Sequence, residues 1–214
     1  MILERVLVNE NLMKVLVLGI SGSPHRHGNT EMLLDSFLSG AENQEALIEK
    51  VVLRDLNYSP CKACNACHKT GECIVNDDLN MLFNRILNVD CLAVASPIYS
   101  MGITAELKGV IDRAQYLWAK KFILKTLYFT NNHIRKHKGL FISTAGLSWD
   151  HVFDTAFPII TAFFNATGFE YYDNIIANDM DRYGGIQEHP TALKDAFSKG
   201  VEVVRAIEKL KRDL

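Results

Sequence analysis

The sequence MKVLVLGISGSPHRHGNT occupies residues 13–30 and is the strongest indication of the fold class. Its first half, Met13 to Ser21, is a continuous run of β-branched and leucine residues, which is typical of a strand buried on both faces of a parallel sheet. From Asn29 to Ala41 the apolar residues recur at the spacing of an amphipathic helix. A buried strand, a loop with glycines and a helix in this order predict the start of a βαβ unit.

The same alternation of strands and helices continues along the chain. We expect strands at residues 13–21, 48–56, 89–95, 139–143 and 169–177, and helices at 29–41, from about 77, and at 104–118, 151–166 and 191–212. Pro158 is expected to kink or restart its helix. The inner face of the last helix is expected to carry Leu193, Phe197, Val201, Val204 and Ile207.

Five alternating units predict an α/β three-layer sandwich with helices on both faces of a parallel sheet. Five strands favour the flavodoxin-like order 2-1-3-4-5 over a six-stranded dinucleotide fold. We find no internal repeat or linker and expect one domain over residues 1–214. It would carry an N-terminal extension at 1–12, a cysteine-rich loop at 56–76 after the second strand, and an inserted arm at 120–138.

The composition is that of a globular protein, because 48% of the 214 residues are hydrophobic and 22% are charged. The formal net charge of −2 gives no reason to expect nucleic acid or an anionic membrane as a partner. No apolar run is long enough to span a bilayer, and residues 1–12 lack the features of a signal peptide. We therefore expect a cytoplasmic protein whose five cysteines stay reduced.

The loop after the first strand is a candidate phosphate site. A helix N-terminus at the carboxyl end of a parallel strand offers free N–H groups and a positive dipole end to an anion. The loop supplies glycines for close approach and short polar side chains as donors: Ser21, Gly22, Ser23, Gly28, Asn29 and Thr30. Neither the P-loop nor the dinucleotide glycine pattern is present, which favours a monophosphate. A plain turn with a helix cap is the alternative.

A second loop follows the third strand, which neighbours the first strand in the expected order. It consists of Ser96, Pro97, Ile98, Tyr99, Ser100, Met101 and Gly102. An aromatic ring, a flexible apolar side chain and a backbone freed by glycine suit the edge and face of a flat ring with carbonyl and imide groups. An ordinary loop with Tyr99 packed on its neighbours is the alternative.

Together the two loops resemble those of NADPH-dependent FMN reductases. The first is similar to the pattern G-S-P-R-x-x-G-N-T, and the second, with Thr104, Leu107-Lys108 and Ile111-Asp112-Arg113, to the flavin-loop signature of that family. The resemblance covers about residues 13–169. It implies an FMN whose phosphate is held by Ser21, Ser23, Asn29 and Thr30 and whose ring is held by Pro97 to Gly102. A third contact region would be Thr144, Ala145 and Gly146. His25 replaces the usual arginine, so Arg26 or a neutral donor is expected to serve the phosphate.

Four of the five cysteines follow the pattern Cys61-x-x-Cys64-x-x-Cys67-x5-Cys73. Three cysteines at three-residue spacing recur in the cluster loops of bacterial ferredoxins, whereas zinc more often takes two separated C-x-x-C pairs. The fifth, Cys91, opens an apolar strand, where a buried thiol behaves as a small hydrophobe. Cys73 is therefore the better fourth ligand, and Gly71 permits the turn that would bring it back.

The cysteine spacing resembles that of the iron–sulfur flavoproteins of anaerobic archaea and bacteria, a branch of the same superfamily. That resemblance implies a [4Fe-4S] cluster beside FMN in a homodimer or homotetramer. Many cluster-free FMN reductases also have a cysteine-rich loop followed by an acidic pair, here Asp77-Asp78. Zinc and a redox dithiol stay open as alternatives.

These features predict a flavin-dependent oxidoreductase that passes electrons between one- and two-electron partners, with the cofactors rather than a catalytic side chain performing the chemistry. The expected donor is a small redox protein such as ferredoxin, or NAD(P)H, although the sequence has no separate nicotinamide motif. The alternatives are a cluster-free NAD(P)H-dependent FMN or quinone reductase, and a redox- or metal-sensing binding protein without turnover.

Overall fold

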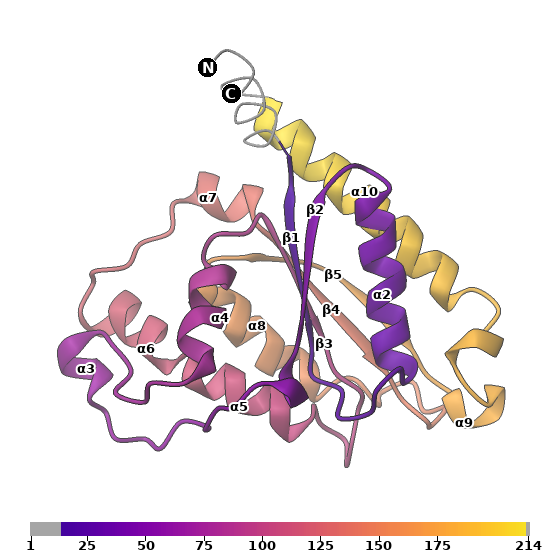
Figure 1. Cartoon of the computed structure of the whole chain (residues 1–214), viewed down its shortest axis with the longest axis horizontal. Helices are drawn as coiled ribbons and strands as arrows, with labels where there is room; N and C mark the ends of the chain where they lie inside the picture. The colour runs from indigo at the N-terminus through magenta and orange to yellow at the C-terminus, as the bar shows by residue number, and fades with distance from the viewer. Residues whose placement is uncertain (1–13, 213–214) are drawn as a thin grey trace.

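The structure is a computed structural model that describes residues 14–212, so the predicted extension at 1–12 lies outside the described residues. Its centre is a parallel sheet of five strands in the order β2-β1-β3-β4-β5, which confirms the predicted topology (Figure 1). The strands are β1 (Leu16–Ser21), β2 (Leu47–Val52), β3 (Cys91–Ala95), β4 (Lys138–Thr144) and β5 (Glu170–Ala177). Every residue of β3 and β4 is buried, as expected for strands covered on both faces.

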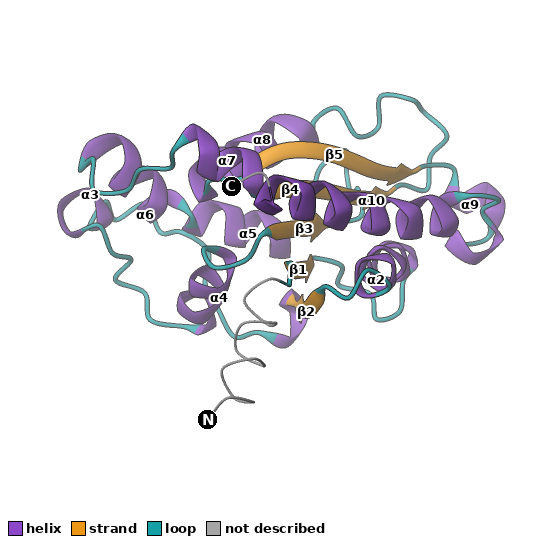
Figure 2. Cartoon of the chain, turned by 90° about the horizontal axis from the view of Figure 1, so that it is seen from above, coloured by secondary structure: helices purple, strands orange, loops and turns teal. Residues whose placement is uncertain are grey.

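Two layers of helices cover the sheet, as Figures 1 and 2 show. One layer is α2 (Asn29–Glu42) and α10 (Ala192–Arg212), and the other is α4 (Asp78–Ile86), α5 (Ala105–Arg113) and α8 (Ala156–Thr167). The shorter elements are α3 (Cys67–Thr70), α6 (Gln115–Trp118), α7 (Asn131–Lys136), α9 (Met180–Tyr183), the 3₁₀ turns η1 (Leu53–Asp55) and η3 (Ile186–Glu188), and the π-helical turn η2 (Ala119–Ile123). No helix within residues 14–212 is long and apolar enough to cross a membrane.

The inner face of α10 differs from the prediction. Val204 and Ile207 are buried as predicted, but Phe197 is 37% exposed, and the other buried positions are Ala192, Ala196, Gly200 and Val203. The cause is close packing on α2, where a Cβ at Gly40 would lie 2.0 Å from the backbone oxygen of Phe197. A Cβ at Gly200 would lie 2.1 Å from the backbone oxygen of Phe37. The small residues of α10 therefore face α2. In the first half of the helix, each buried position lies one residue before the position predicted.

Two predicted helices are shorter than expected. The helix predicted at 104–118 divides at Ala114 into α5 and α6. Thr104 caps its start by accepting a hydrogen bond from the N–H of Leu107. The second begins only at Ala156, and residues 151–155 form turns. Pro158 lies in the first turn of α8, where its missing N–H breaks no helical hydrogen bond, so it starts the helix rather than kinking it.

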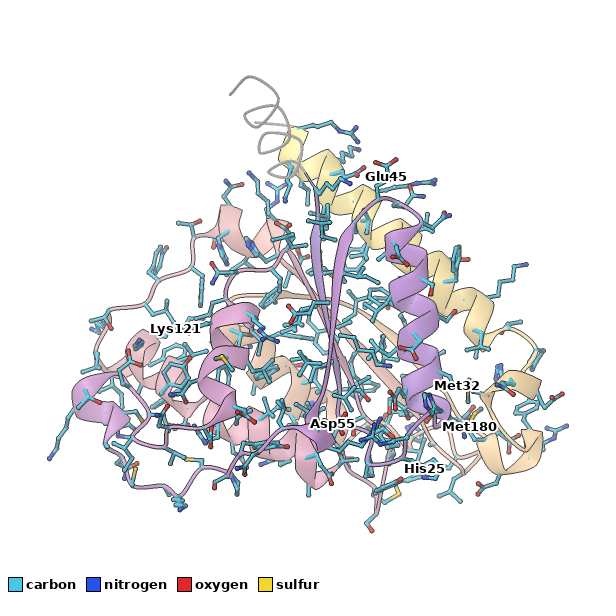
Figure 3. All side chains as sticks on the ribbon, in the orientation of Figure 1. His25, Met32, Glu45, Asp55, Lys121 and Met180 are labelled. Atoms are coloured by element: carbon cyan, nitrogen blue, oxygen red, sulfur yellow. The ribbon has the colours of Figure 1, made fainter. Side chains whose placement is uncertain are left out.

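Residues 120–138, predicted as an inserted arm, contain most of η2 and all of α7, joined by an extended segment. The arm ends at Lys138, which is the first residue of β4 and pairs with Glu170 at 2.5 Å. Lys121 of this arm lies on the side of the sheet that carries α4, away from the carboxyl ends of β1 and β3 (Figure 3).

Candidate functional site

A cavity of about 220 Å³ lies at the carboxyl ends of the strands, where three loops meet. Ten of the residues predicted to bind the cofactor line it: Ser23, Gly28, Asn29, Thr30, Pro97, Ile98, Tyr99, Thr144, Ala145 and Gly146. The first loop follows β1, the second follows β3, and the third follows β4. Because β1, β3 and β4 are neighbours in the sheet, these loops converge although they are far apart in the sequence.

The N-terminus of α2 faces this cavity. Gly28 occupies the N-cap position, and in the described part of the chain no side chain caps the first turn of the helix. Since the first N–H groups of a helix have no partner inside it, they are available to an anion. Thr30 and Thr144 share a hydrogen bond of 2.5 Å between their hydroxyls, which ties the first loop to the third. These features fit a phosphate better than a bulky apolar group.

The phosphate loop is braced from behind by a buried ion-pair cluster. Arg54 donates to the backbone oxygen of Ser23 at 3.0 Å and to Glu31 at 2.9 Å. Glu31, whose side chain is 4% exposed, also pairs with Lys50 at 2.9 Å and accepts from the backbone N–H of His27 at 3.1 Å. Burial alone raises the pKa of Glu31, but the hydrogen bonds and charges of Arg54 and Lys50 lower it to about 2. The carboxylate therefore stays ionised and holds the loop in shape.

The structure places six of the predicted residues outside the cavity lining. Arg26 pairs with Asp55 at 2.5 Å and does not line the cavity, whereas His25 does. Ser21 is buried at the end of β1, and its hydroxyl has no hydrogen-bond partner within residues 14–212. The remaining residues are Ser96, Ser100, Met101 and Gly102, which shape the second loop.

The second loop is held in a tight turn. Tyr99 and Gly102 exchange two backbone hydrogen bonds, at 2.8 and 3.0 Å, and Ser100 and Met101 between them have positive φ angles of 47° and 65°. Ser96 accepts from the N–H of Thr104 at 2.9 Å. The turn presents Tyr99, which is 52% exposed, at the cavity. A planar ligand would therefore meet an aromatic side chain here.

Besides His25, two cavity residues were missed by the sequence analysis. Met180 and Asp181 belong to α9, directly after β5, and both line the cavity. Asp179 starts this turn with a positive φ of 63°. Asn29 accepts a hydrogen bond from the N–H of Ile186 at 3.0 Å, which holds the segment after α9 near the start of α2. No local pattern marks these residues, because only the tertiary fold brings them to the site.

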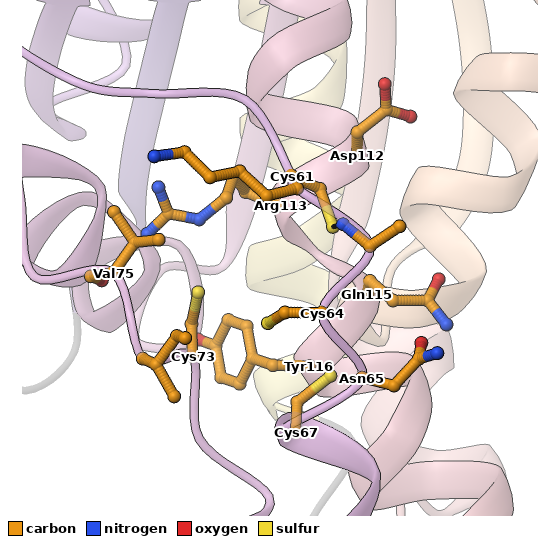
Figure 4. Close-up of a pocket in the computed structure, with 13 residues that line it drawn as sticks. Cys61, Cys64, Asn65, Cys67, Cys73, Val75, Asp112, Arg113, Gln115 and Tyr116 are labelled. Atoms are coloured by element: carbon orange, nitrogen blue, oxygen red, sulfur yellow. Dashed lines mark hydrogen bonds between the residues drawn. The ribbon is translucent and has the colours of Figure 1, made fainter.

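The second candidate site is the cysteine loop. Cys61, Cys64, Cys67 and Cys73 line one cavity of about 440 Å³, together with Arg113 and Tyr116 from α5 and α6 (Figure 4). Gly71 ends α3 with a φ of 76°, which confirms the turn predicted there. Burial, and then the neighbouring thiols of Cys61, Cys64 and Cys73, raise the pKa of Cys67. The four cysteines therefore line the same cavity, and their thiols affect one another's ionisation.

The four thiols are the kind of donor that an iron–sulfur cluster uses. Within residues 14–212, no group of three or more His, Cys, Asp or Glu side chains is arranged to hold one metal ion. Zinc would need four ligands at about 2.0–2.3 Å from one point. A cubane takes one thiolate at each of its iron atoms, and these four cysteines line one cavity. Cys91 is fully buried in β3, and burial raises its pKa.

An ion pair fixes the cysteine loop to the fold. Arg113, which is 2% exposed, donates to Asp77 at 2.7 Å, to the backbone oxygen of Ser59 at 2.8 Å and to that of Val75 at 3.1 Å. Asp77 also caps α4, as expected for an acidic residue at a helix start. Burial alone raises the pKa of Asp77, but Arg113 and the backbone N–H groups of Ser59 and Leu79 lower it. Arg113 thus connects both sides of the loop to α5.

Known proteins resemble the chain in sequence. A family model for NADPH-dependent FMN reductase matches residues 13–151. The chain is 33% identical over 109 residues to an iron–sulfur flavoprotein of Methanosarcina thermophila, covering 51% of this chain and 57% of the relative. It is 37% identical over 95 residues to one of Archaeoglobus fulgidus, covering 44% of this chain and 43% of the relative. The chain therefore spans about half the length of the curated relatives it matches.

Solved structures share the fold at low sequence identity. An NAD(P)H:quinone oxidoreductase from Methanothermobacter marburgensis superposes with a TM-score of 0.65 at 17% identity, over 89% of this chain and 97% of that chain. A flavone reductase gives the same TM-score at 18% identity, over 94% of this chain and 65% of that chain. The family model covers well over half of the chain and includes the loops after β1 and β3 and the cysteine loop. The chain therefore belongs to the NADPH-dependent FMN reductase family.

Proposed function

We propose that the protein is a flavin-dependent oxidoreductase that uses FMN and a [4Fe-4S] cluster to pass electrons between one- and two-electron partners. When bound, FMN exchanges one or two electrons and the cluster exchanges one at a time. The observation that carries the proposal is the presence of two separate cavities in one domain. One has a helix N-terminus suited to a phosphate, and the other is lined by four thiols.

In this proposal the FMN phosphate lies at the start of α2, bound by Ser23, Asn29, Thr30 and the free N–H groups of the helix. The imidazole of His25, rather than Arg26, would donate to the phosphate, because His25 lines the cavity while Arg26 is paired with Asp55. Pro97 to Gly102 would hold one side of the flavin ring. Thr144, Ala145 and Gly146, with Met180 and Asp181, would hold the other.

The cluster would be held by Cys61, Cys64, Cys67 and Cys73. The helix α5 joins the two cavities: it begins just after the second flavin loop and ends at Arg113 in the cysteine cavity. Its nine residues rise about 13 Å, so the two cofactors would lie within one small domain. Separate loops would hold each cofactor, so loss of one need not release the other.

The proposed donors are a small redox protein such as ferredoxin, or NAD(P)H. Several curated relatives are named iron–sulfur flavoproteins, and one solved neighbour is named an NAD(P)H:quinone oxidoreductase, which supports a redox role. We further propose a homodimer or homotetramer in the cytoplasm.

The cluster-free NAD(P)H-dependent reductase is the second candidate, because the fold and the FMN cavity require no iron. Protein purified anaerobically should be mixed with reduced ferredoxin or with NAD(P)H while its visible spectrum is recorded. We expect flavin bands and a broad iron–sulfur shoulder in the spectrum, and rapid reduction of the flavin and the cluster by reduced ferredoxin. Flavin bands alone with rapid NAD(P)H oxidation would favour the cluster-free reductase, and no flavin would favour a sensor.

A further inference from the structure

A buried cation lies against the cysteine cavity. The Arg113 guanidinium is 2% exposed and lines this cavity with the four cysteines. Its two terminal nitrogens are occupied by Asp77 and by the backbone oxygens of Ser59 and Val75. The side chain therefore has a fixed position, set by both flanks of the cysteine loop.

One donor of this guanidinium is unused. The Nε atom of Arg113 is buried and has no hydrogen-bond partner within residues 14–212. A buried donor without a partner costs free energy, and such groups in native proteins call for an explanation. Figure 4 shows the Cys73 sulfur directed toward the Arg113 guanidinium. Burial alone lowers the pKa of Arg113, but Asp77 and then Cys73 raise it.

We propose that Arg113 Nε donates a hydrogen bond to the sulfur of Cys73 when the cluster is bound, and that this bond raises the reduction potential of the cluster. The inference rests on the proposed function. It gives Arg113 an effect on the reduction potential of the cluster in addition to its structural role in holding the cysteine loop. Reduction adds a negative charge to the cluster, and a hydrogen bond to a ligating sulfur favours the more negative state. Because the Nε atom is buried, solvent screens this donor little.

The decisive comparison is between Arg113→Lys and Asp77→Asn in the full-length protein loaded anaerobically. Arg113→Lys keeps the positive charge beside Asp77 but removes Nε. Asp77→Asn weakens the brace but keeps Nε. We expect Arg113→Lys to make one-electron reduction of the cluster at least tenfold less favourable, a fall of about 59 mV in midpoint potential. Asp77→Asn should not lower the potential, because it removes a nearby negative charge.

A redox titration followed by electron paramagnetic resonance gives these potentials, and iron per chain shows whether each variant is loaded. Arg85→Gln, which removes a cation from an exposed ion pair with Glu49, is the control and should leave the potential unchanged. Equal potentials in Arg113→Lys and wild type would overturn the inference. Equal falls in Arg113→Lys and Asp77→Asn would also overturn it, since they would indicate a loosened loop only.

A second measurement needs no variant. In wild-type protein labelled with ¹⁵N-arginine, electron–nuclear double resonance on the reduced cluster should detect a ¹⁵N coupling from Nε. Within residues 14–212, Arg113 is the only arginine that lines the cysteine cavity. Lack of a coupling would overturn the inference even if Arg113→Lys fails to fold. Lack of iron in wild-type protein would instead overturn the proposed function, and is seen before any potential is measured.

Discussion

Replacing Glu31 by glutamine should destabilise the protein strongly at neutral pH. The carboxyl pKa falls from its ordinary value of 4.5 to about 2 because Arg54 and Lys50 favour the ionised form. At about 1.4 kcal/mol per pKa unit, this difference corresponds to about 3 kcal/mol of stability when the group is ionised. The side chain is 4% exposed, so little of this is lost to solvent screening. Glutamine keeps the shape but removes the carboxylate that pairs with Arg54 and leaves Lys50 with Asp35 as its remaining anion.

The pH dependence follows from the lowered pKa. The stabilisation is fully present above pH 4.5, where Glu31 is ionised in both the folded and unfolded chain, and is lost as the pH falls toward 2. The gap between wild type and Glu31→Gln should shrink from about 3 kcal/mol at pH 7 to about 1 kcal/mol at pH 3.

Urea unfolding of flavin-free protein at pH 7, 5, 4 and 3, in the presence of a reductant, measures this gap. Flavin must be removed because a ligand adds its own stability. Glu42→Gln is the matched control: it lies at the exposed end of the same helix and should change stability by less than about 0.5 kcal/mol. Equal stability of wild type and Glu31→Gln at pH 7, or a gap that does not vary with pH, would show that the ionised Glu31 does not stabilise the fold.

Three further predictions test the two cavities and the helix layer. Replacing Asn29 and Thr30 together with alanine should weaken FMN binding by about 1.5–3 kcal/mol per lost charge-assisted bond, with little effect on riboflavin, which lacks the phosphate; equal weakening of both in a fluorescence titration would place the phosphate elsewhere. Cys73→Ala should lose iron but keep FMN, whereas Cys91→Ala should keep both; the reverse result for iron would show that the ligand set is wrong. Gly40→Ala should cost about 1–3 kcal/mol in urea unfolding, because its Cβ would lie 2.0 Å from a backbone oxygen of α10, and an unchanged midpoint would mean that the helices separate freely.

The sheet could be predicted from the sequence because its central strands are continuous apolar runs. Burial on both faces leaves no alternation to misread, and the loops after β1 and β3 follow directly from where those runs end. The cysteine loop was equally visible, since its four thiols lie within 13 residues. Features that lie within one short stretch of sequence can be predicted without knowing the tertiary structure.

The rest depends on contacts between distant residues. Arg26 was expected at the phosphate, but Asp55, 29 positions later, draws it away. Met180 and Asp181 reach the flavin cavity only because β5 lies beside β4. The pairing of Arg113 with Asp77 spans 36 positions and gives the cysteine loop its anchor. No spacing rule in the sequence predicts any of these three contacts.

The central claim is that one chain binds both FMN and an iron–sulfur cluster. The most direct test is the content of iron, acid-labile sulfide, zinc and FMN per chain in wild-type protein prepared anaerobically. We predict about four iron, about four sulfide and about one FMN per chain, with no stoichiometric zinc. One zinc per chain without sulfide, or FMN without any iron, would contradict it.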